Sequence, residues 1–223
     1  MAEDMFLFWG SGSPPCWRAM IALEEKGLQG YKNKLLNFEK GEHKQPEVLE
    51  VNPRGQLPAF RHGEKKVNES LAICMYLESQ FKSRGTQLIP DKAADQALVY
   101  QRAFEGLVLQ QKLVDLLMYA RHVPEEERQE TTMKRNMEAA SAEAQLWEGH
   151  VQEGSCLAGK DFTMADVVVY PVVALMFRLG LSTEKYPKLS QYNDFLKDRP
   201  SIKATYPPHW LESPPTSDLL KSL

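Results

Sequence analysis

The order of apolar and polar positions in the first third of the chain predicts a small mixed α/β unit. The aromatic-rich run Met5–Trp9 ends at Gly10, as is typical of a buried strand followed by a turn. We expect a helix to begin at Pro14, because proline is tolerated in a first helical turn, and to end near Gly27. The apolar stripe of this helix consists of Cys16, Ala19, Met20 and Leu23.

Three further strands and a second helix are expected next. A weakly alternating run predicts a strand over 34–38, and His62-Gly63-Glu64 predicts a hairpin turn between strands 57–61 and 65–68. Helical spacing of apolar residues returns over 70–81. A β-α-β unit followed by a β-β-α unit predicts a mixed sheet with helices packed on it.

Beyond residue 81 the strand signals disappear. The polar segment 82–90 contains a glycine and ends in proline, so we place an interdomain linker at 82–91. Apolar residues three and four positions apart then predict an all-helical domain over 92–223, after an α/β domain over 1–81. A chain of 223 residues is long enough for two such domains.

One helix start in the second domain carries a specific capping signature. Thr163 can accept a hydrogen bond from the backbone N–H of Asp166, and the Asp166 carboxylate can accept one from the Thr163 N–H. The helix that follows is apolar on nearly all sides. We therefore expect it at the buried centre of the second domain, with a kink at Pro171.

Charge and composition narrow the classes of partner. The 27 basic and 30 acidic side chains give a net charge of −3, which argues against nucleic acid, because phosphate contacts need clustered Lys and Arg. Three scattered cysteines suit a reducing compartment better than a disulfide framework. Without a secretory signal, a membrane-spanning stretch or metal-ligand spacing, we expect a cytoplasmic protein with no membrane or metal partner.

Candidate chemistry gathers at three element starts: Ser13 before the first helix, Leu57-Pro58 entering a strand, and Glu69-Ser70 opening the second helix. Together they supply a hydroxyl, backbone groups beside a proline and helix N-termini, the layout of a site for glutathione, a small anionic peptide with one thiol. A serine O–H at a helix start can stabilise a thiolate. A simple N-cap is the commoner role of a serine before proline and is favoured for Ser13 by position alone, and Ser11 is a rival donor.

The other two motifs also admit plain structural roles. A cis Leu57–Pro58 bond would turn the Leu57 backbone groups toward a bound peptide, whereas a trans bond would only begin a strand. Ser70 can bind a carboxylate and Glu69 an ammonium group, or the two can form a helix cap with an N-terminal acid.

Two further positions are ambiguous from the residues alone. His43 and Lys44 can pair with a second carboxylate or belong to a solvated basic loop. Cys16 invites a redox role, but it has no second cysteine in a C-x-x-C and it lies in the apolar stripe, so packing is favoured.

Five segments carry a resemblance to a known family: SPPCWRAMIALEEKG, GEHKQPEVLEVNPRGQLPAF, VNESLAICMYLE, FTMADVVVYP and YPKLSQYNDFLKDRPSIKATYP. Through them the chain resembles the cytosolic glutathione transferases along essentially its whole length. The serine-type start followed by NPRGQLP is most similar to the rho class seen in fish, with the theta, delta and zeta classes as relatives. The resemblance implies a thioredoxin-like N-terminal domain, an all-helical C-terminal domain and a homodimer.

The resemblance also implies roles for single residues. The implied glutathione contacts are Ser13 at the thiol, Leu57 and Pro58 at the cysteinyl unit, Glu69 and Ser70 at the γ-glutamyl unit, and His43, Lys44 and Gln56 at the glycine carboxylate. Thr163 and Asp166 match a capping box that serves folding and does not touch the substrate.

Some residues depart from related classes. Delta-type sequences often have His at the position of Gly55 and Arg at that of Leu71, so two glutathione contacts are missing here. Zeta-type isomerases carry an S-S-C motif where this chain has Ser-Pro-Pro, which argues against isomerase activity. Omega-type enzymes have cysteine at the position of Ser13, which disfavours a cysteine-based thioltransferase.

The implied reaction is conjugation. Ser13 and the helix N-terminus stabilise the thiolate of glutathione, a co-substrate, and this thiolate attacks a small apolar electrophile without any cofactor. The electrophile pocket is expected between the domains, with walls formed by Trp9, Leu107, Gln111, Asp115 and Met118 and with Trp210 as a lid. Core packing is the alternative role for the apolar members of this set.

Two other functions remain open. The same fold can serve a non-catalytic protein that binds ligands or other proteins, and poor activation of the thiol would mark it. A glutathione-dependent isomerase or peroxidase would keep the thiolate and use a different acceptor.

Overall fold

The computed structural model describes residues 2–152, 155–213 and 217–223. The chain forms two compact units, Met1–Pro90 with Asp198–Pro214 and Asp91–Lys197 with Pro215–Leu223. The sequence-based boundaries assign the whole of 92–223 to one helical domain, whereas residues 198–213 pack within the first unit. They do so because polar side chains of this segment bond to the first helix of the chain.

The first unit is built on a four-stranded mixed sheet in the order β2-β1-β3-β4. Its strands are β1 (Met5–Trp9), β2 (Lys32–Leu35), β3 (Ala59–His62) and β4 (Lys65–Asn68). β1 pairs parallel with β2, and the β1–β3 and β3–β4 pairs are antiparallel. The expected mixed sheet and its hairpin are therefore confirmed.

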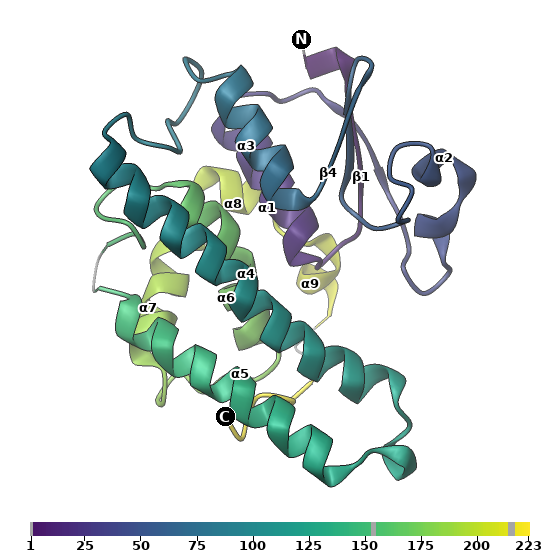
Figure 1. Cartoon of the computed structure of the whole chain (residues 1–223), viewed down its shortest axis with the longest axis vertical. Coiled ribbons are helices and arrows are strands. Elements are labelled where there is room, and N and C mark those ends of the chain that lie inside the picture. The colour runs from purple at the N-terminus through teal and green to yellow at the C-terminus, as the bar shows by residue number, and fades with distance from the viewer. Residues whose placement is uncertain (1, 153–154, 214–216) are drawn as a thin grey trace. The chain divides into compact units, whose positions relative to one another are not determined.

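Helices cover both faces of this sheet. Figure 1 shows α1 (Pro14–Glu25) and α3 (Ser70–Gln80) on one side and the short α2 (Pro46–Leu49) on the other. α1 and α3 pack against each other. Short 3-10 turns lie at Ala2–Asp4 and Glu42–Lys44 in this unit, and α8 (Pro200–Ala204) and α9 (Pro208–Glu212) complete it.

The second strand lies earlier than its apolar residues suggest. β2 covers Lys32–Leu35, whereas the alternation predicts 34–38. All four β2 residues are exposed, because the strand lies at the edge of the sheet, where polar side chains are favoured. The buried Leu36 follows the strand, with its N–H bonded to the Trp9 carbonyl, and Phe38 is 41% exposed.

The C-terminal end of α1 is capped and ionically tied. Gly27 has a φ of +61°, and the N–H groups of Gly27 and Leu28 bond back to Glu24 and Leu23, a Schellman motif. The Lys26 ammonium is fully buried and lies 2.7 Å from Glu78 of α3 and 2.9 Å from the Thr86 carbonyl. The expected linker is thus fastened to the first unit through Thr86.

Glu25 makes the matching contact with the returning C-terminal segment. Its carboxylate accepts hydrogen bonds from Arg199 Nε at 2.6 Å and Nη2 at 2.8 Å, and another from the Ser201 hydroxyl. Burial raises the pKa of Glu25, but the bonds from Arg199 and Ser201 outweigh burial and hold this pKa below its usual value. The pair therefore stabilises the fold above the pH at which this group titrates in the unfolded chain, and the stabilisation is lost as the pH falls.

The second unit is helical among its described residues, apart from an isolated bridge between Cys156 and Gly159. Its helices are α4 (Ala93–His122), α5 (Glu130–His150), α6 (Met164–Arg178) and α7 (Pro187–Leu196), with a 3-10 turn at Glu125–Glu127. α4 packs on α5 and α6, and no residue from Met164 to Ala174 in α6 is exposed, so its central place in this unit is confirmed. None of the described helices is long and apolar enough to cross a membrane.

The capping box of α6 is present. The fully buried Asp166 carboxylate accepts from the Thr163 N–H at 2.9 Å, the Leu157 N–H at 3.0 Å and the Tyr192 hydroxyl at 3.1 Å. Burial raises the pKa of Asp166, and these hydrogen bonds offset only part of the rise. The carboxylate thus joins the start of α6 to α7 and to the segment before the helix.

Replacing Arg199 with Met should lower the free energy of unfolding by about 3 kcal/mol, since Glu25 would stay buried without its cation. This is the low end of the effect for buried pairs, because Arg199 is 28% exposed. Urea denaturation followed by circular dichroism measures it. Lys203→Met is the matched control, because its pair with Asp198 is exposed, and it should cost less than about 1 kcal/mol. Equal small losses in both variants would contradict the assignment.

Thr163→Ala should cost about 1 kcal/mol, the usual effect of losing an N-cap. Asp166→Ala should cost about 3 kcal/mol or more, because the buried Leu157 N–H and Tyr192 O–H lose their acceptor as well. Denaturant titration of both variants measures the two values. If Asp166→Ala were no worse than Thr163→Ala, the carboxylate would be acting as a cap alone.

Candidate active site

The register of the sheet brings the three element starts to one edge. Phe8 near the end of β1 lies opposite Ala59 at the start of β3, and Ala59 lies opposite Asn68 at the end of β4. The chain segments that leave or enter the sheet at these points are Gly10–Ser13, Leu57-Pro58 and Glu69-Ser70. The three element starts therefore follow or precede strand ends that are neighbours in the sheet.

A tight turn at Gly10–Ser13 connects β1 to α1. The Ser13 N–H bonds to the Gly10 carbonyl at 3.4 Å, and Gly12 has a φ of +74°, a conformation that favours glycine. Ser13 occupies the N-cap position with extended backbone angles, yet its side chain makes no capping hydrogen bond. The Ser13 hydroxyl therefore does not cap α1, although Ser13 occupies the N-cap position.

Two prolines shape the chemistry at the start of α1. Pro14 and Pro15 carry no N–H, so the first helical positions offer few backbone donors, and the serine hydroxyls are the main donors there. Burial raises the pKa of the Cys16 thiol to about 11, although hydrogen bonds with Ser13 and the Gly10 N–H lower it somewhat. Cys16 is fully buried, which supports its expected packing role.

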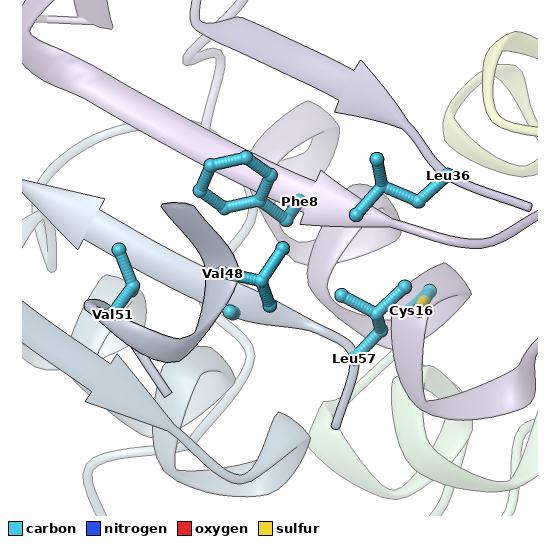
Figure 2. Packing of buried hydrophobic residues seen from close by; sticks show 7 residues of the cluster. Phe8, Cys16, Leu36, Val48, Val51 and Leu57 are labelled. Atoms are coloured by element: carbon cyan, nitrogen blue, oxygen red, sulfur yellow. The ribbon is translucent and has the colours of Figure 1, made fainter. Parts of the chain in front are cut away.

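A core cluster fixes the loop before β3 against the start of α1. It consists of Phe8, Cys16, Leu36, Val48, Val51, Leu57 and Ala59. Figure 2 shows the Leu57 side chain beside Cys16, with Phe8 and Val48 further along the cluster. The Leu57–Pro58 bond is cis, the first of the two alternatives that the sequence left open.

Asn52 shapes this loop from within. It is 4% exposed, its Nδ2 donates to the Gln56 carbonyl at 2.8 Å, and its Oδ1 accepts from the Arg54 N–H at 3.2 Å. The backbone from 52 to 57 is therefore folded by a side chain that the sequence analysis did not single out.

The start of α3 combines an unusual backbone with a buried cation. Glu69 has a φ of +67° and is the one non-glycine residue in the described part of the chain with positive φ, a conformation that costs free energy and often marks functional sites. The buried Ser70 hydroxyl accepts a hydrogen bond from Arg18 Nη1 at 3.3 Å. Burial lowers the pKa of Arg18 to about 10, so its guanidinium remains charged at neutral pH.

The basic loop approaches the 52–57 loop. Lys44 Nζ donates to the Arg54 carbonyl at 3.1 Å, and a Cβ at Gly55 would lie 2.8 Å from the Lys44 side chain, so Lys44 fills the space that a larger residue at position 55 would need. The buried Nδ1 of His43 has no hydrogen-bond partner among the described residues. Burial and the neighbouring Lys44 lower the pKa of His43, which keeps the imidazole neutral near pH 7.

The residues expected at the electrophile pocket are divided between the two units. In the first unit Trp9 is partly buried and bonds to Asn33 Oδ1, and Trp210 is 8% exposed, with its ring 5.5 Å from that of Trp17. In the second unit Gln111 and Asp115 are exposed and hydrogen-bonded to each other. Leu107 is half-buried and Met118 is 38% exposed.

Asp115 and Met118 also line a cavity of about 700 Å³ within the second unit. Its other walls come from α4 and α5 and include Lys112, Tyr119, Thr132, Arg135 and Asn136. This lining mixes charged and apolar groups, and the lid and wall roles of the six residues stay predictions.

Comparison with known proteins identifies the family. Residues 3–79 match the family model for the glutathione S-transferase N-terminal domain, and residues 111–200 match that for the C-terminal domain. The chain is similar to glutathione S-transferase A of Pleuronectes platessa, with 60% identity over 225 residues and full coverage of both chains. The chain belongs to the glutathione S-transferase family.

Two solved structures give the same assignment. A glutathione S-transferase from the Antarctic clam Laternula elliptica is 40% identical, with a TM-score of 0.88 over 99% of this chain and all of that one. Glutathione transferase URE2P6 of Phanerochaete chrysosporium, solved with oxidized glutathione, is 26% identical, with a TM-score of 0.81 over 94% and 96% of the two chains. The thioredoxin-like first domain and helical second domain of the glutathione S-transferase family are thus confirmed.

Sequence reasoning missed three side chains that contact the candidate site of this glutathione S-transferase: Arg18, Asn52 and His209. A lone Arg inside the apolar stretch of α1 was the available signal for Arg18. Asn52 lay in an unpatterned loop, and the partner of His209, Ser11, lies 198 residues away in the chain, so neither had a local signal.

The buried thiols should be unreactive in the folded transferase. At a pKa of about 11 for Cys16 and about 12 for Cys74, less than roughly one part in a thousand of either is thiolate at about pH 8. A chromogenic thiol reagent should therefore react slowly with the native chain and with three thiols once the chain is unfolded in denaturant. A thiol that reacts rapidly in the native state would reopen the cysteine-based alternative.

Proposed function

We propose that this chain conjugates glutathione to small apolar electrophiles, with the substrate sulfur held at the Gly10–Ser13 turn. The observation that supports the proposal is the sheet register, which brings the Ser13 hydroxyl, not used to cap α1, to the same edge as the Leu57-Pro58 entry and the Glu69-Ser70 helix start. These three groups correspond to the thiol, the backbone and the γ-glutamyl end of one tripeptide.

Ser13 is the group that activates the thiol. A serine that caps a helix accepts through its oxygen and keeps its one proton, and the Ser13 oxygen does not make even this contact with α1. Its neighbour Cys16 remains a thiol near neutral pH and needs no proton from Ser13. The Ser13 O–H is therefore available to donate to the glutathione thiolate, which lowers the pKa of the substrate thiol from its free value of ~8.5.

The remaining contacts orient the peptide. Ser70, backed by the buried charge of Arg18, receives the γ-glutamyl carboxylate, and the exposed Glu69 receives the γ-glutamyl ammonium. The backbone of Leu57, before Pro58, pairs with the cysteinyl unit. The neutral His43, whose Nδ1 has no partner among the described residues, takes the glycine carboxylate together with Lys44 and Gln56.

Several broader features belong to the same proposal. The 60% identity to glutathione S-transferase A of Pleuronectes platessa, a fish enzyme, supports placement in the rho class. The wall roles of Trp9, Leu107, Gln111, Asp115 and Met118 and the lid role of Trp210 are part of the same proposal. We place the protein in the cytoplasm as a homodimer, as is typical of the family.

Ser13→Ala should reduce kcat/KM for conjugation of glutathione to a chloronitrobenzene about 10- to 100-fold, the effect of losing one charge-assisted hydrogen bond of about 1.5–3 kcal/mol. Glutathione affinity, measured by calorimetry, should change little, because the hydrogen bond acts on the thiolate. Ser79→Ala is the control, since Ser79 is exposed on α3 away from this edge, and it should match the wild type.

Other outcomes would point elsewhere. A wild type that binds glutathione and conjugates nothing would favour the non-catalytic protein, or an isomerase or peroxidase, and a substrate panel would separate these. Full activity in Ser13→Ala would move the activating role to another donor.

A further inference from the structure

A histidine near the C-terminus contacts the turn that precedes α1. Ser11 Oγ lies 2.5 Å from Nδ1 of His209, a residue of α9. A Cβ added to Gly12 would lie 2.6 Å from His209 Cε1 and 3.0 Å from Trp210 Nε1, so the turn and α9 approach closely at a glycine. Both segments belong to the first unit.

Packing fixes the place of His209 at this turn. Trp210 is 8% exposed and meets Trp17 of α1 edge-on at 5.5 Å and Tyr206 at 5.7 Å. Trp17 in turn donates from Nε1 to the Thr205 hydroxyl at 2.8 Å. Trp17 of α1 therefore holds α9 through its contact with Trp210, while His209 remains exposed beside Ser11.

The direction of the Ser11–His209 hydrogen bond determines what Ser11 can do. If the imidazole accepts the Ser11 proton, the hydroxyl has none left for a substrate. If His209 Nδ1–H donates to Ser11 Oγ, the Ser11 O–H is free, and accepting one hydrogen bond makes a hydroxyl a stronger donor to the next group. Near a thiolate the second arrangement is favoured, because the anion attracts the Ser11 proton.

We infer that His209 is a positioning residue that turns the Ser11 hydroxyl toward the glutathione sulfur. The sulfur then has two hydroxyl donors, Ser13 directly and Ser11 supported by His209. This inference rests on the proposed function, because it assumes that the substrate thiolate lies at the Gly10–Ser13 turn. No proton is transferred in this arrangement; His209 and Ser11 each donate one hydrogen bond.

The test compares His209→Ala, Ser11→Ala and the double variant. Each single variant should lower kcat for conjugation about five- to tenfold with little change in KM for glutathione, as expected for one hydrogen bond made to the thiolate. The double variant should lose no more than either single one, because the two residues act through the same hydroxyl. The ultraviolet absorbance of bound glutathione, titrated against pH, should show a raised thiol pKa in all three.

Two further variants separate positioning from a merely structural role. His209→Asn keeps an N–H near the place of Nδ1 and should retain more than about half of the wild-type kcat. Leu211→Ala alters the same short helix at a residue that is 76% exposed, and it should leave kcat and the thiol titration unchanged. A thermal unfolding midpoint measured for each variant checks that α9 stays folded.

The inference is overturned if His209→Ala leaves kcat and the titration of bound glutathione unchanged, or if the losses in the double variant multiply. It is also overturned if His209→Asn is as impaired as His209→Ala. The titration needs no turnover, so it still tests the pair if the wild type binds glutathione and conjugates nothing. That last result would count against the proposed function alone.

Discussion

The first unit depends on two adjacent buried charges at the end of α1. Lys26 is fully buried, and Glu25 is 7% exposed, so each must keep its partner or lose several kcal/mol of stability. Their partners lie on other segments: Glu78 on α3, Thr86 in the connecting segment, and Arg199 near the C-terminus. One helix end therefore fixes the position of three other parts of this unit.

The consequences reach the other end of the same helix. A helix of twelve residues is stiff, so fixing its C-terminal end also directs the N-terminal end, where Ser13 lies. The Cys16 side chain then holds that end in the core cluster with Leu57. Stability and chemistry are thus linked through α1. Buried ion pairs hold its C-terminal end, and apolar packing of Cys16 holds the N-terminal end, where the Ser13 hydroxyl lies.

Local signals in the sequence were sufficient for most of the fold. The strand Met5–Trp9, the hairpin turn at Gly63 and the capping box at Thr163 depend on neighbours within a few residues, and all three are present. The predicted position of β2 was wrong by a few residues, because an exposed edge strand has no apolar pattern that marks its bounds. The return of residues 198–213 to the first unit was missed, because it depends on the Glu25–Arg199 pair, whose members lie 174 residues apart.

The same distinction applies to the candidate site. Serine and proline motifs at element starts are local, and the sheet register then brings them together, so their convergence could be predicted from topology alone. Arg18 bonds to Ser70, and His209 bonds to Ser11. Both partners lie far away in the chain, so no local pattern predicts these contacts. The residues that we propose to contact the substrate are thus the easier ones to find. The groups that contact the serine hydroxyls become visible only when the chain is folded, and in our proposal the orientation of each hydroxyl at this turn decides which serine donates a hydrogen bond to the sulfur.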